Sequence, residues 1–242
     1  MTDLSALRGA NADRWAHAKL TRASDFTLVA QRLAAPKAKA RYLAVAVRTG
    51  VPWFVIAVIH DRECSQSWTG SLAQGDPWNK KSVHVPAGRG PFASWEDAAV
   101  DALVNCPPYA ARNKDWSAGG RPTLLEQYNG LGYANGGRPS PYVWAGTDQY
   151  VSGKYVRDGV YDPNAIDRQL GCAGLILAMA AIDTSIKFGV LAANDNVPRV
   201  VARTGQLGVP PHPDAAPAKP SITNPAPGSI GAWIVSLFKK AA

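Results

Sequence analysis

The sequence predicts an α+β fold that is mostly α-helical and carries a small β-hairpin lobe. Helix start and stop signals recur along the first 182 residues, where caps and prolines bracket apolar runs. One stretch, residues 66–91, is instead broken by glycine and proline, and we expect it to form the hairpin lobe. Apolar residues make up 46% of the 242 and charged residues only 18%, which favours a packed core over a disordered chain.

The first 50 residues are expected to be helical. Helices are predicted over residues 25–34 and 37–48, because Pro36 separates two helix-forming segments. Val51-Pro52 then opens a third helix over residues 53–63. This helix is apolar on all sides except in its last turn, so we expect it to be buried in the core.

The elements after residue 63 are predicted from helix-capping residues and from the glycines and prolines that interrupt regular structure. Residues 82–85 are predicted to form a short strand in the lobe. Ser94 is a cap for a helix over residues 95–104, with Asp97 at the capping-box position. Further helices are expected over 122–127 and over 162–182, where Asp162-Pro163 reads as a cap followed by a first-turn proline.

The net charge of +8 is unevenly distributed along the chain. Residues 1–50 carry nine Lys/Arg against three Asp/Glu, residues 51–193 carry twelve against thirteen, and residues 194–242 carry five against two. We therefore expect a basic helical part (1–50) packed on a neutral body (51–193). A proline-rich linker or wrapping tail (194–229) and a short amphipathic basic segment (230–242) follow. Basic flanking segments favour contact with an anionic cell envelope, whereas the net charge of −1 over residues 51–193 argues against nucleic-acid binding.

Several classes of protein are disfavoured by what the sequence lacks. Its three cysteines form neither a disulfide framework nor a zinc-binding pattern, and no phosphate-binding loop is present, so no cofactor and no metal are expected. The N-terminus has no signal-peptide pattern, and no apolar run approaches the roughly 18 residues of a membrane span. We expect a monomer that is made in the cytoplasm, so that an action outside it would require another component to release the protein.

Glu63 is the candidate catalytic residue. It continues the stripe of Ile56 and Ile59 at the end of the buried helix, whereas Asp61 points about 160° away. Partial burial raises the pKa of a carboxyl group and keeps it protonated near neutral pH, as a general acid for glycosidic cleavage requires. The alternative is that Glu63 only pairs with Arg62 or with solvent at a helix end.

Four segments, in this order, resemble the lysozyme superfamily, and most closely a group of lysozyme-like phage endolysins. They are His60-Asp61-Arg62-Glu63-Cys64-Ser65, Gly75-Asp76-Pro77, His84-Val85-Pro86-Ala87-Gly88 and Gln127-Tyr128-Asn129-Gly130-Leu131-Gly132-Tyr133. The resemblance covers roughly residues 40–182, and Cys64 stands where serine is commoner. It implies a lysozyme-like fold and a glycoside hydrolase that cleaves the β-1,4 glycan bond of peptidoglycan, with Glu63 as its acid.

The resemblance also implies the remaining site residues. Asp76 is the candidate second carboxylate that positions the attacking water, although Gly-Asp-Pro is also an ordinary turn. Substrate-binding residues are expected to be Ser65, Trp68, Ser82, His84, Tyr128, Asn129 and Tyr133. Either Tyr128 or Tyr133 is expected to approach the acid.

Other functions remain open on the sequence. A lytic transglycosylase would use the sugar's own 6-hydroxyl group and would need no second carboxylate. An enzyme acting on chitin or chitosan could use the same fold. A non-catalytic protein could bind cell-wall glycan without cleaving it.

Overall fold

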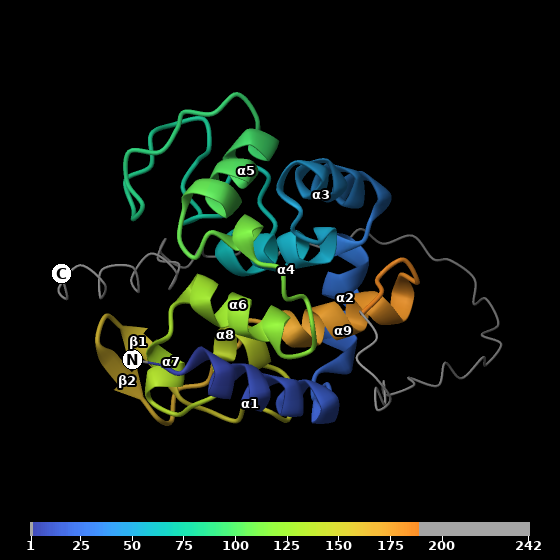
Figure 1. The fold of residues 1–242 in the computed structure, drawn as a ribbon, viewed down its shortest axis with the longest axis vertical. Helices are drawn as coiled ribbons and strands as arrows, with labels where there is room; N and C mark the ends of the chain where they lie inside the picture. The colour runs from blue at the N-terminus through green and yellow to red at the C-terminus, as the bar shows by residue number, and fades with distance from the viewer. Residues whose placement is uncertain (1, 189–242) are drawn as a thin grey trace, which may run out of the picture.

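The computed structural model describes residues 2–188 of the 242 (Figure 1). Most of the ordered elements are helices, and one antiparallel sheet of two strands accompanies them, so the α+β class is confirmed. The helices are α1 (Leu4–His17), α2 (Ala23–Leu33), α3 (Pro36–Thr49), α4 (Trp53–Cys64), α5 (Trp95–Asn105), η1 (Ala110–Arg112), α6 (Gly120–Asn129), α7 (Gly132–Asn135), α8 (Pro141–Trp144) and α9 (Cys172–Ile182). The strands are β1 (Lys154–Arg157) and β2 (Val160–Asp162).

Helices α2 to α5 form where caps and prolines predict them. Pro36 is the first residue of α3, and Gly50 ends it with a left-handed φ of 73° that glycine adopts without strain. Ser94 caps α5, because its hydroxyl oxygen accepts a hydrogen bond from the Asp97 backbone N–H.

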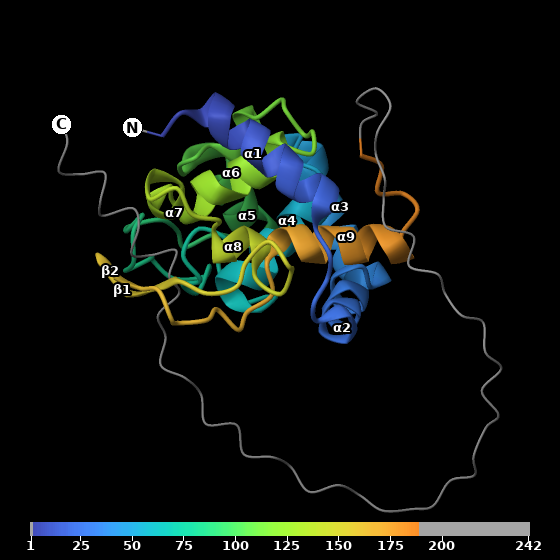
Figure 2. The same cartoon turned by 90° about the horizontal axis from the view of Figure 1, so that it is seen from below.

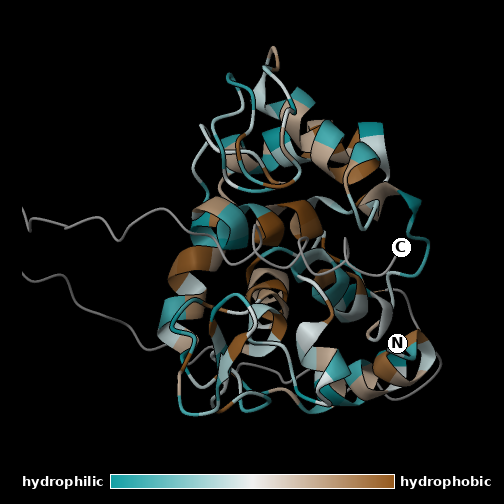
Figure 3. Cartoon of the chain, turned by 90° about the vertical axis from the view of Figure 1, so that its left-hand side faces the viewer, coloured by the Kyte–Doolittle hydropathy of each residue, from teal (hydrophilic) through white to brown (hydrophobic). Residues whose placement is uncertain are grey.

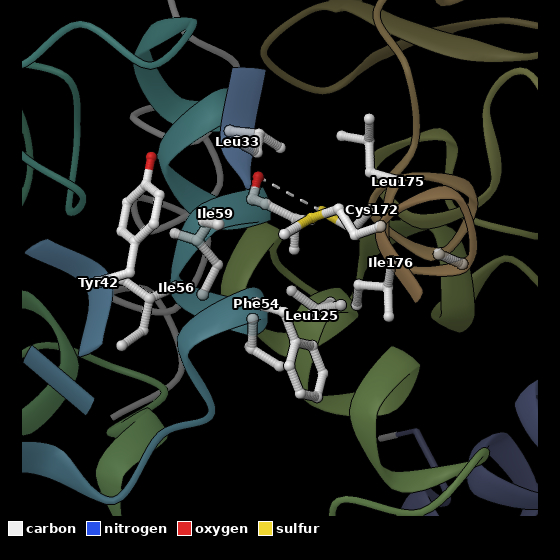
Figure 4. Close-up of a cluster of buried hydrophobic side chains, with 14 of the residues drawn as sticks. Leu33, Tyr42, Phe54, Ile56, Ile59, Leu125, Cys172, Leu175 and Ile176 are labelled. Atoms are coloured by element: carbon white, nitrogen blue, oxygen red, sulfur yellow. Dashed lines mark hydrogen bonds between the residues drawn. The ribbon is translucent and has the colours of Figure 1, made fainter. Parts of the chain in front are cut away.

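Helix α4 lies at the centre of the molecule, and its residues 53–63 are all buried. Its side chains meet those of α2, α3, α6 and α9 in the core, as Figure 4 shows for Leu33, Tyr42, Ile59, Leu125 and Cys172. In Figure 3 apolar residues concentrate on the central helices and polar residues on the loops. Within residues 2–188 no single helix is long and apolar enough to span a membrane. Helices α3 and α4 together have the required length and composition, but they are bent by 113° relative to each other.

The N-terminal helices are built into this fold. Helix α1 packs on α6 (Figure 2), α2 packs on α9, and α3 packs on α4 and α5. Six of the nine basic residues in 1–50 form ion pairs, five of them with carboxylates beyond residue 50: Arg8–Asp115, Arg22–Asp25, Arg32–Asp61, Lys39–Asp183, Arg41–Glu96 and Arg48–Asp97. Much of the excess positive charge of this segment is therefore compensated within the protein.

Two predicted elements are wrong. Residues 82–85 form no strand; the lobe is a loop with one isolated bridge between Gly70 and Pro77, and the hairpin is made by β1 and β2. The predicted helix over 162–182 begins only at Cys172, because Asp162 closes β2 and its carboxylate accepts the Asn164 N–H in a turn. The linker over 194–229 and the segment over 230–242 lie outside the described residues, as do residues 189–193 of the predicted body.

Candidate active site

Glu63 lies in the last turn of α4, where the chain turns sharply away from the helix. Ser65 ends α4 with a left-handed φ of 53°, and the lobe loop folds back at once against the helix end. The approach is so close that a Cβ atom on Gly75 would lie 3.1 Å from the backbone oxygen of Glu63. The lobe loop thus covers one side of the Glu63 backbone.

The two carboxyl oxygens of Glu63 have different surroundings. Tyr142, on α8, donates its hydroxyl hydrogen to Oε1 at an O–O distance of 2.9 Å. Oε2 has no hydrogen-bond partner among residues 2–188, and the residue retains 5% of its surface exposed. One oxygen is therefore fixed in place, and the other is the atom from which a proton can be transferred.

Burial raises the pKa of Glu63 to about 7, chiefly because the carboxylate form loses hydration. The hydrogen bond from Tyr142 and the positive charge of Arg62 oppose this effect and stabilise the ionised form. At neutral pH a substantial fraction of Glu63 is therefore protonated, as a general acid must be before it reacts.

A buried ion-pair network supports the Tyr142 ring. The Arg62 guanidinium lies 4.8 Å from the centre of the ring. It donates to Oδ2 of Asp167 at 3.0 Å and to the Leu170 carbonyl oxygen, and the Arg62 and Asp167 side chains are each only 4% exposed. Lys154, on β1, pairs with the second oxygen of Asp167 at 3.2 Å. The network holds the partner of the acid and links it to the hairpin.

Asn129 and Tyr128 lie at the end of α6. Asn129 is 3% exposed, and its amide group makes no hydrogen bond with any residue in 2–188, which leaves it available to a ligand. Tyr128 donates to the Leu72 carbonyl oxygen in the lobe loop at 3.0 Å. Its pKa is raised by burial first and then by the nearby charge of Glu63, so Tyr128 belongs to the same site.

A tyrosine outside the expected pair bonds Glu63. Tyr142 makes this hydrogen bond, whereas Tyr128 lies near enough for the charge of Glu63 to raise its pKa. Tyr133 points instead toward the hairpin, where its hydroxyl oxygen accepts the Tyr155 backbone N–H at 3.0 Å. Sequence reasoning missed Tyr142 because it is only one of several tyrosines between residues 128 and 161.

Asp76, the candidate second carboxylate, is occupied within the lobe loop. Oδ2 accepts the backbone N–H groups of Val83 and His84, and Oδ1 lies 2.6 Å from Nδ1 of His84. These hydrogen bonds hold the pKa of Asp76 below its ordinary value despite desolvation. The carboxylate clamps the loop and turns the half-exposed His84 ring toward solvent.

Two other residues that were expected to bind substrate, Trp68 and Ser82, make contacts within the protein instead. Trp68 packs edge-on against His60 and Trp95, with ring centres 4.7 and 4.6 Å apart, so much of its surface anchors the lobe. Ser82 donates to the Pro86 carbonyl oxygen and accepts the Arg89 N–H, which closes the loop on itself. Ser65 is exposed beside Glu63, and its hydroxyl group has no hydrogen-bond partner among residues 2–188.

A second buried carboxyl group resembles Glu63 in its electrostatics. Burial raises the pKa of Glu126 to about 7 as well, with partial offsets from the Asn11, Arg14 and Trp144 side chains. Glu126 is 1% exposed, and both of its oxygens are sealed from solvent without a hydrogen bond of good geometry. A raised pKa therefore does not distinguish the two glutamates; they differ in that, among residues 2–188, Oε2 of Glu63 is unbonded but is not among the sealed atoms, whereas both oxygens of Glu126 are sealed.

A pocket of about 330 Å³ lies elsewhere. It is lined by Thr21, Arg22, Gly146, Tyr150, Val151, Ile166, Asp167 and Arg168. It shares Asp167 with the network behind Tyr142 but does not include Glu63, so its volume does not describe the candidate active site.

Comparison with protein-family models, curated protein sequences and solved structures finds no match.

Proposed function

We propose that this chain is a phage-type endolysin, a glycoside hydrolase with a lysozyme-like fold that cleaves the β-1,4 glycan bond of bacterial peptidoglycan. One observation carries the proposal: Glu63 ends a buried helix with a raised pKa, one oxygen is fixed by Tyr142, and the other has no hydrogen-bond partner among residues 2–188. That is the state in which a carboxyl group protonates a glycosidic oxygen. The ordered motifs around Glu63 support peptidoglycan as the substrate.

In the proposed reaction, Oε2 of Glu63 gives its proton to the oxygen of the leaving sugar, and the bond from that oxygen to C1 breaks. Glu63 is then a carboxylate, which the Tyr142 hydroxyl group and the Arg62 charge stabilise. Positive charge develops on the other sugar ring until a nucleophile bonds to C1. In hydrolysis the nucleophile is water, and its proton passes to the candidate base, the Asp76 carboxylate.

The state of Asp76 makes a lytic transglycosylase the second candidate. Because its carboxylate is taken up by three hydrogen bonds in the lobe loop, Asp76 is poorly placed to activate water. A transglycosylase needs no such group: the 6-hydroxyl oxygen of the sugar attacks its own C1, and the hydroxyl proton returns to Glu63. The product is then an anhydro sugar.

Mass spectrometry of fragments released from purified sacculi tests the proposal. Hydrolysis yields fragments with a reducing end, whereas transglycosylation yields fragments lighter by one water. Parallel digests of chitin and chitosan test those polymers as substrates. Recovery of intact sacculi with the protein bound to them would instead show a non-catalytic wall-binding protein.

Replacing Tyr142 with phenylalanine is expected to move the alkaline limb of the activity profile to higher pH. The reason is that Tyr142 lowers the pKa of Glu63, so its loss leaves Glu63 protonated over a wider range. Activity at the optimum should fall by about tenfold, since the carboxylate loses a charge-assisted hydrogen bond as it forms. Initial rates measured between pH 5 and 9 check this, and an unchanged or acid-shifted limb would contradict it.

A further inference from the structure

One face of the β1–β2 hairpin is an aromatic surface that the proposed catalytic step does not use. Tyr155 and Tyr161 are directly opposite each other in the two strands and therefore share one face. Their ring centres are 5.4 Å apart, and both rings pack edge-on against Tyr133. Tyr155 and Tyr161 remain half-buried, so part of each ring reaches the surface.

The hairpin is fixed to the candidate active site at two points. Tyr155 donates to the carbonyl oxygen of Gly132, three residues after Asn129, at 3.4 Å. Lys154 pairs with Asp167, which also binds Arg62 beside Glu63. In Figure 1 the hairpin and the lobe loop lie on the same side of the molecule, below and above the level of α6.

An exposed cation, Arg138, lies on this aromatic face. The Arg138 guanidinium is 4.1 Å from the centre of the Tyr161 ring, and the residue is exposed. No acidic residue in 2–188 forms an ion pair with it, whereas ten other contacts between basic and acidic side chains occur in that range. An exposed guanidinium that lies on an aromatic ring can form a bidentate hydrogen-bonded pair with a carboxylate of a ligand that contacts the same rings.

We propose that Tyr155, Tyr161 and Arg138 form a subsite for an acidic amino sugar, such as a muramyl residue. The tyrosine rings bind the apolar face of the sugar, and Arg138 binds the carboxylate of its lactyl group or attached peptide. This inference rests on the proposed function, because it supplies a second contact for the glycan that reaches Glu63. Such a subsite would favour peptidoglycan over a neutral glycan such as chitin.

Binding of two soluble glycans tests the subsite. Titrations use the full chain carrying Glu63→Gln, which prevents turnover, with a muramyl-containing tetrasaccharide that bears free carboxylates and with neutral chitotetraose. Adding Arg138→Gln should weaken binding of the muramyl glycan by about three- to tenfold and leave chitotetraose unchanged. Adding Tyr161→Ala should weaken binding of both by about tenfold.

Two controls keep the result specific. Lys37→Gln removes a positive charge from an exposed position on α3, a helix that lies far from the hairpin in Figures 1 and 2, and should change neither affinity. Tyr161→Phe keeps the aromatic ring and should bind both glycans nearly as well as the parent Glu63→Gln chain. This result would show that contact with the ring, and not the hydroxyl group, is what Tyr161 contributes to binding.

If the unsubstituted chain cleaves sacculi but Arg138→Gln binds the muramyl glycan normally, the subsite is overturned and the proposed function stands. A chain that neither binds nor cleaves glycan overturns both.

Discussion

Replacing Glu63 with glutamine is expected to lower the rate of sacculus cleavage by about a hundred- to ten-thousandfold. Glutamine has nearly the same shape and can keep a contact with Tyr142, but it has no proton to give to the leaving oxygen. The fold should survive, because a substantial fraction of Glu63 is already uncharged at neutral pH, as glutamine is. Release of soluble fragments from purified sacculi measures the rate, and circular dichroism checks the fold.

Glu126→Gln is the matched control for this substitution. Glu126 is also a buried glutamate with a pKa near 7, so the substitution makes the same chemical change in a similar electrostatic setting. It is sealed between α1 and α8 rather than open to a ligand, and we expect the variant to retain near-normal activity. Full activity in Glu63→Gln, or equal losses in the two variants, would remove the catalytic assignment of Glu63.

Replacing Asp167 with asparagine is expected to lower the free energy of unfolding by about 3–5 kcal/mol at pH 7. The substitution leaves the Arg62 guanidinium buried without its carboxylate, and burial without a counter-charge is costly. The pKa of Asp167 is held below its ordinary value, chiefly by Arg62 and Lys154 against the effect of burial. Its contribution to stability is therefore present above the unfolded-state pKa and is lost as pH falls through the folded-state pKa.

Urea unfolding at pH 7 and at acidic pH measures both effects, since the difference between wild type and variant should narrow in acid. Asp25→Asn is the control: it breaks the Arg22–Asp25 pair, in which both side chains are well exposed, and should cost under about 1 kcal/mol. Equal small losses in both variants at pH 7 would show that the Arg62–Asp167 pair is not a major support of the fold.

Local signals in the sequence predicted the helices well where those signals act on neighbouring residues. Pro36 and Ser94 set the starts of α3 and α5 through their own backbone and side-chain geometry. The unbroken apolar run of α4 required burial wherever the helix packed, and it placed Glu63 at the edge of the core. The same kind of reasoning failed at Asp162-Pro163, because the pairing of β1 with β2 decided the conformation there.

The partners in the candidate site are set by contacts between distant parts of the chain. Tyr142 is 79 residues from Glu63, and Asp167 is 105 residues from Arg62, so no periodicity or spacing could pair them. Asp76 shows the opposite case: its position in a turn was visible in the sequence, but the hydrogen bonds that occupy its carboxylate were not.

The sequence by itself therefore determined a mainly helical chain with one helix that is apolar up to its last turn and has a carboxylate in that turn. Only the tertiary structure decided how the two buried glutamates differ in their surroundings. Glu63 and Glu126 have similarly raised pKa values, because burial desolvates both. They differ in what residues 2–188 place around their oxygens: Glu63 has one oxygen bonded by Tyr142 and one without a hydrogen-bond partner, whereas both oxygens of Glu126 are sealed in the core.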